Sequence, residues 1–131
     1  MNSKWLIFIM IFSSLGLGCE YKSVSPKPET CASLPDSVKF TSTILPIINK
    51  NCNTGGCHSG TRPDGNLNLE SANAYGNLTN PKKDYINIKS PSNSMIYSMM
   101  NGAGTVMPPT GKLSACSTEA VLKWIEQGTL K

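Results

Sequence analysis

The chain has 131 residues, which is the length of at most one domain. Charged residues make up only 15% of it, and the net charge is +4. Without the first 18 residues, 11 basic and 8 acidic residues leave a net charge of about +3. This weak positive charge is not clustered, so a function in nucleic-acid binding is not expected.

The first 18 residues have the pattern of an export signal. After Lys4 come 13 uncharged and mostly apolar residues, Trp5 to Leu17, which are too few for a membrane span of about 20 residues. The stretch ends in Gly18-Cys19, and "LGLGC" resembles a bacterial lipobox. The resemblance implies cleavage before Cys19 and its lipidation, which would anchor an exported protein at a bacterial membrane, on the periplasmic or outer-membrane face. The alternative is an ordinary signal peptide with an incidental cysteine.

The segment after the signal is expected to be a tether. Residues 19–35 contain the two close prolines of "SPKPETC" and show no apolar period. The remaining residues, 36–131, then form the domain. A chain this short buries a modest core, so a large apolar cofactor would help it to fold.

Apolar spacing predicts helices and little strand, and therefore an all-α domain. In the first predicted helix, "TSTILPIINKNC", isoleucines recur at i, i+3 and i+4. Thr41 or Ser42 would cap this helix, so that it begins near 41–43. It would run into Cys52 and hold Pro46 in its first turns, where the backbone N–H has no partner.

Two further helices are predicted towards the C-terminus. The middle one lies in "SNSMIYSMM", with a cap near Ser92 or Asn93. The last lies in "EAVLKWIEQ", where Ser117 or Thr118 would be the cap and Gly128 would end the helix. Its buried face is expected to consist of Val121, Leu122, Trp124 and Ile125.

The stretches between the helices predict loops, because both are rich in Gly, Pro and Asn. They are "HSGTRPDGNLNLESANAYGNL" and "NGAGTVMPPTGKL". Within the first, Leu67 and Leu69 would point to the same side of a short extended piece.

The stretch "CNTGGCH", Cys52 to His58, differs from the haem c attachment motif C-x-x-C-H by two additional residues between the cysteines. Attachment needs two thiols that reach the vinyl groups of haem and an imidazole under the iron. The additional residues must bulge out, which Gly55 and Gly56 permit because glycine accepts positive φ. A zinc site is disfavoured, because there is no second histidine and adjacent Cys57 and His58 are poorly placed to chelate one ion. A Cys52–Cys57 disulfide beside an inert His58 is another alternative.

A haem in an electron carrier needs a second axial ligand, commonly methionine opposite histidine. Met107 lies 49 residues after His58, in "GTVMPPTGKL", where two prolines stiffen the backbone. Met95, Met99 and Met100 have the helical spacing of core residues. Met107 is therefore the candidate ligand, with Met99 or Met100 as the second choice.

Several motifs, in their order along the chain, resemble small class I c-type cytochromes, and in particular exported cytochrome c-like domains. They are "FTSTILPIINKNCNTGGCHSG", "GNLNL", "PSNSMIYSMM", "MPPTGKLS" and "VLKWIEQG", and they cover about residues 38–130. The resemblance implies an all-α, cytochrome c-like fold, with three to four short helices and long loops around one covalent haem c. It implies that Cys52 and Cys57 form the thioethers, that His58 is the proximal ligand and that Met107 is the distal ligand.

The resemblance also bears on the remaining cysteines. The two terminal helices cross in cytochromes of this class, which implies a disulfide between Cys31, before the first helix, and Cys116, at the start of the last. The alternative is two free thiols.

The function implied is that of a monohaem lipoprotein that carries single electrons between exported or membrane redox proteins, as a monomer. A haem with both axial positions filled is poor at binding oxygen or peroxide, so an electron carrier is expected rather than a peroxidase or another redox enzyme. The alternative is a haem-free lipoprotein that serves as a structural or binding module, with a Cys52–Cys57 disulfide.

Overall fold

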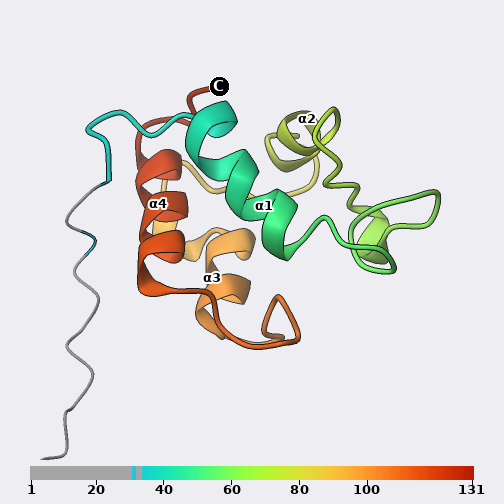
Figure 1. Cartoon of the computed structure of the whole chain (residues 1–131). Coiled ribbons are helices and arrows are strands. Elements are labelled where there is room, and N and C mark those ends of the chain that lie inside the picture. The colour runs from blue at the N-terminus through green and yellow to red at the C-terminus, as the bar shows by residue number, and fades with distance from the viewer. Residues whose placement is uncertain (1–30, 32–33) are drawn as a thin grey trace, which may run out of the picture.

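The computed structural model describes residue 31 and residues 34–131. The predicted signal peptide, the predicted lipidation site Cys19 and most of the predicted tether lie outside the described residues. The described part has no strand, as expected of an all-α domain. Long loops join its four α-helices (Figure 1), which are α1 (Leu45–Asn51), α2 (Ala74–Leu78), α3 (Met95–Asn101) and α4 (Ala115–Glu126). Over the residues described, no helix combines the length and the hydrophobicity needed to cross a membrane.

The first helix begins earlier than predicted. One π-helical turn, Phe40–Ile44, precedes α1, and its N-cap is Lys39, whose side chain makes no capping hydrogen bond. The predicted cap at Thr41 or Ser42 is therefore wrong. The backbone N–H of Phe40 instead donates to the carbonyl of Leu130 (2.8 Å). A residue distant in the sequence therefore satisfies this N–H group at the start of the helix.

The last helix also begins before its predicted cap. Ser114 is the N-cap of α4, and its hydroxyl oxygen accepts the backbone N–H of Ser117 at 3.2 Å. The hydroxyl of Thr118 is occupied within the helix, where it donates to the Ala115 carbonyl (2.9 Å). Gly128 follows the helix with a φ of +78°, which confirms the predicted end.

The middle helix is displaced in the same way, by one or two residues. Its N-cap is Ser94, whereas Ser92 and Asn93 belong to a short 3₁₀ turn, Pro91–Asn93. Ser94 is fully buried, and its hydroxyl oxygen accepts the backbone N–H of Asn87 at 2.9 Å. The side chain therefore fixes the incoming loop rather than a helical N–H.

One helix, α2, lies in a stretch that the composition predicts as loop. Ala74 and Leu78, four positions apart, are both buried, and Tyr75 packs edge-on against Phe40 with ring centroids 5.1 Å apart. The helix is short and contains glycine and asparagine, so its propensity is poor and its stability comes from this packing.

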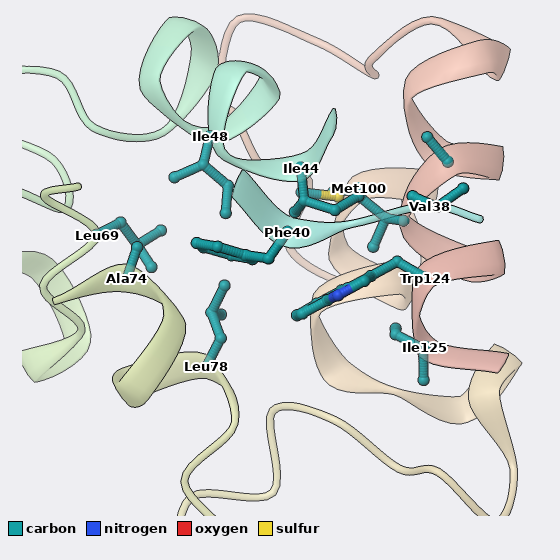
Figure 2. Close-up of a cluster of buried hydrophobic side chains, with 12 residues drawn as sticks. Val38, Phe40, Ile44, Ile48, Leu69, Ala74, Leu78, Met100, Trp124 and Ile125 are labelled. Carbon is teal, nitrogen blue, oxygen red and sulfur yellow. The ribbon is translucent and has the colours of Figure 1, made fainter. Parts of the chain in front are cut away.

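Aromatic contacts at the centre of the core connect the first helix with α4. Figure 2 shows Phe40 between Ile48, Leu78 and Trp124, and the rings of Phe40 and Trp124 have centroids 5.5 Å apart. Trp124 is completely buried, and its indole N–H donates to the Leu130 carbonyl at 2.9 Å. The core as a whole consists of Val38, Phe40, Ile44, Ile48, Leu69, Ala74, Leu78, Met100, Ala120, Val121, Trp124 and Ile125.

The predicted cysteine pair is present. Cys31 and Cys116 lie at disulfide-bonding distance, with sulfur atoms 2.15 Å and Cα atoms 5.1 Å apart. The bond closes a loop of 85 residues, which in the chain-entropy model stabilises the fold by about 4 kcal/mol. At the opposite end of α4, the side-chain oxygen of Gln127 accepts a hydrogen bond from the backbone N–H of Val38 at 2.8 Å.

Replacing Trp124 by Ala should destabilise the fold by about 3–5 kcal/mol, because it empties the centre of the core and removes the indole hydrogen bond. The measurement is denaturant unfolding followed by circular dichroism. Ile88→Ala is the control, since Ile88 is 58% exposed and its loss should change the free energy of unfolding by less than about 0.5 kcal/mol. Similar losses for the two variants would contradict the central role of Trp124.

Candidate functional site

A cavity of about 610 Å³ adjoins the core and shares some of its residues. It is lined by side chains of α1, of the segment that follows α1, of α3 and of the loop that carries the two adjacent prolines. Most of these side chains are apolar, among them Ile48, Leu69 and Leu78. A cavity of this size and character is typical of a site for a cofactor or an organic ligand.

The four residues that are predicted to bind haem, two through thioether bonds and two as axial ligands, all line this one cavity. Cys52, Cys57 and His58 come from the end of α1 and the following turn, whereas Met107 comes from the distant proline-containing loop. Met99 also lines the cavity, so the second-choice ligand is present at the same site.

The turn "CNTGGCH" keeps its two ends together despite the additional residues. The backbone N–H of His58 donates to the carbonyl of Cys52 (3.3 Å), and the N–H of Cys57 donates to the carbonyl of Thr54 (3.0 Å). In a C-x-x-C-H segment with helical geometry, the bond between the histidine N–H and the first cysteine carbonyl would span one α-turn. Here the same two residues are bonded across the insertion, so the extra residues are looped out.

The glycines of this turn differ in conformation. Gly56 has a φ of +83°, as expected for a residue in the bulge, whereas Gly55 is not in the positive-φ region. A Cβ atom at either position would meet no atom within 4 Å. Only Gly56 is therefore required to be glycine for conformational reasons.

The thiols of Cys52 and Cys57 are not joined to one another in the structure, and both are half-buried. The disulfide of the alternative is thus not formed in this structure, and the alternative function stays a prediction. Both side chains line the cavity, as does Thr54 between them, whereas Gly55 and Gly56 are exposed.

The chemistry of Cys52 is that of a neutral thiol. Burial raises the pKa of Cys52 to about 11, and neighbouring Cys57 acts in the same direction. Among the residues that the structure describes, no three His, Cys, Asp or Glu side chains are grouped so as to hold a metal ion.

His58 is the single histidine of the chain, and one of its two ring nitrogens lies close to two backbone carbonyl oxygens. Its Nδ1 atom lies 3.2 Å from the carbonyl oxygens of both Asp64 and Leu67. Carbonyl oxygens only accept hydrogen bonds, so this geometry favours the tautomer with the proton on Nδ1. The Nε2 atom of that tautomer has a free lone pair and can bind a metal.

The extended piece predicted around Leu67 and Leu69 supplies part of the cavity wall. Both side chains line the cavity, as the predicted common direction requires. The backbone N–H of Leu69 donates to the carbonyl of His58 at 2.7 Å, which ties this wall to the candidate ligand.

Some residues that line the cavity could not be predicted from the sequence. Tyr85 and Ile96 line the cavity from the loop before α3 and from α3 itself, and the N–H of Ile96 donates to the Tyr85 carbonyl at 3.2 Å. Only the folded arrangement brings Tyr85 to this place. Leu78 also lines the cavity, and its spacing of four from Ala74 was the one available sign of α2.

Comparisons of this chain with family models, with curated proteins and with solved structures found no match. Its function is therefore argued from the chemistry of the site.

The two glycines of the turn provide a matched pair of variants. Gly56→Ala should destabilise the protein by about 1 kcal/mol, because alanine is strained at positive φ. Gly55→Ala should be neutral or stabilising by up to about 1 kcal/mol, because it only restricts the unfolded chain. Thermal or denaturant unfolding of both variants measures the difference. Equal effects would show that the bulge does not depend on the conformation of Gly56.

Proposed function

We propose that the protein is a monohaem c-type cytochrome of the class I type, which carries single electrons between exported or membrane-bound redox proteins. The observation that supports this most is the convergence of Cys52, Cys57, His58 and Met107 on one apolar cavity of about 610 Å³. In this proposal the chain is exported, lipidated at Cys19 and held at a bacterial membrane by acyl chains, and it works as a monomer.

The donor set fits covalent haem. Two unpaired thiols line the cavity for thioether bonds, and His58 and Met107 supply the nitrogen and sulfur that are usual axial ligands of cytochromes c. Haem bound there would supply an iron that alternates between its ferric and ferrous states. The chain has the separate tasks of holding the ligands, excluding water and restricting rearrangement.

The position of Met107 is fixed by its backbone. Its N–H donates to the carbonyl of Met99 in α3 at 3.1 Å, and two prolines follow it directly. A thioether held in this way would favour the ferrous state and raise the reduction potential relative to a second histidine. The apolar wall formed by Ile48, Leu69 and Leu78 would act in the same direction, because it excludes water.

Electron transfer is favoured over catalysis by the same ligands. With His58 and Met107 both bound, no axial position would remain for oxygen or peroxide. A peroxidase reaction would require Met107 to leave, against the hydrogen bond that holds its backbone to α3. We therefore propose a carrier rather than an enzyme.

Covalent attachment of haem tests the proposal. Expressed with a haem c maturation system, the mature chain should give the pyridine haemochrome spectrum of haem c, and mass spectrometry should show one haem added. Replacing both Cys52 and Cys57 by Ser should abolish this addition, whereas Cys31→Ser/Cys116→Ser should retain it. Absence of covalent haem in the unmodified chain under permissive maturation would refute the proposal.

The distal ligand is tested separately. Met107→Ala should abolish the weak far-red absorption that a methionine–ferric iron bond produces, and it should lower the reduction potential. Met99→Ala serves as the matched control, since Met99 lines the same cavity and should leave the band in place. Loss of the band in Met99→Ala alone would assign the ligand to Met99.

A further inference from the structure

The loop that follows His58 contains both acceptors of its ring N–H. The carbonyl oxygens of Asp64 and Leu67, each 3.2 Å from Nδ1, belong to residues 59–69. Little regular structure supports this loop, since it contains one 3₁₀ turn and left-handed residues at Gly60, Gly65 and Asn66. Inside the loop, the backbone N–H of Asp64 donates to the carbonyl of Cys57 at 2.8 Å, which holds Asp64 directly. The direction of the Leu67 carbonyl depends on how the ends of the loop are held.

Two hydrogen bonds close the loop at its neck. The backbone N–H of Leu69 donates to the carbonyl of His58 at 2.7 Å. The backbone N–H of Gly60 donates to carboxylate oxygen Oε1 of Glu70 at 3.1 Å. The segment leaving His58 and the segment returning towards α2 are thus joined by one backbone bond and one side chain.

The second carboxylate oxygen connects the neck to α2. Oε2 of Glu70 accepts a hydrogen bond from the side-chain amide of Asn68 (Nδ2, 3.1 Å). In return, Oδ1 of Asn68 accepts a hydrogen bond from the backbone N–H of Glu70 (2.8 Å). The carbonyl of Asn68 in turn accepts Nδ2 of Asn77, in α2, at 2.7 Å. These bonds hold the pKa of Glu70 below its usual range, Asn68 contributing most and Gly60 next.

From this geometry we propose that Glu70 is a positioning residue for His58. Its carboxylate closes the neck of the loop, and the closed loop presents the two carbonyl oxygens that orient the imidazole and keep its proton on Nδ1. The proposal rests on the proposed function as far as His58 is an iron ligand, but the orientation of the ring is a property of the chain alone.

The carboxylate is specifically required, because it accepts hydrogen bonds at both oxygens. Glutamine at position 70 has the same shape but only one oxygen, so its NH₂ group would face a donor, either the Gly60 N–H or the Asn68 amide. Glu70→Gln should therefore open one side of the neck without removing volume. Because Glu70 is partly exposed, this change should leave the fold intact.

The first measurement uses the haem-free chain. His58 is the single histidine, so nitrogen NMR of protein labelled with ¹⁵N-histidine reports its tautomer without ambiguity. The unmodified chain and the exposed control Glu119→Gln should show the Nδ1–H form. Glu70→Gln and Glu70→Ala should show a mixture with the Nε2–H form. An unchanged Nδ1–H form in both Glu70 variants would overturn the proposal.

The second measurement uses the haem-loaded chain. A hydrogen bond from Nδ1–H makes the imidazole a stronger electron donor, which favours ferric iron, so its weakening in Glu70→Gln should raise the reduction potential. Glu119→Gln should leave the potential unchanged, and equal potentials in all three proteins would count against Glu70. Failure of the unmodified chain to attach haem would refute the proposed function, while the NMR result would still decide the role of Glu70.

Discussion

A single carbonyl group, that of Leu130, fixes how the two ends of the domain meet. It accepts the backbone N–H of Phe40 at 2.8 Å and the indole N–H of Trp124 at 2.9 Å. The first bond sets where the first helix begins, and the second sets the rotation of α4 against it. Because α1 ends one residue before Cys52, the position of the cavity's first thiol follows from this junction. The disulfide between Cys31 and Cys116 reinforces the same arrangement from outside the core.

Repeating apolar positions were enough to predict the three longer helices, but not where they begin. Thr41, Ser42 and Ser117 all have cap-forming side chains, yet the N-terminal groups are satisfied by Leu130 in one case and by Ser114 in the other. The first arrangement depends on a tertiary contact, and the second depends on a choice among several nearby serines. Propensity does not resolve such choices, and it also misses α2, which depends on the packing of Tyr75 against Phe40.

The candidate site was predictable to the extent that its chemistry is specific. Cysteine, histidine and methionine are rare enough in this chain for their order to indicate a site, and the cavity contains all four predicted residues. The supporting shell was not predictable, because it is made of common residues and backbone groups. Nothing in the sequence singles out the carbonyls of Asp64 and Leu67, or Glu70 among the acidic residues.

The bond between the His58 N–H and the Cys52 carbonyl holds the two ends of the turn together although five residues separate them. Gly55 and Gly56 lie in open space, whereas Thr54 contributes to the wall of the cavity. A motif defined by a fixed count of intervening residues describes only the shortest way to build this geometry. Chains that differ in this count can therefore bring the same two residues together through the same backbone hydrogen bond.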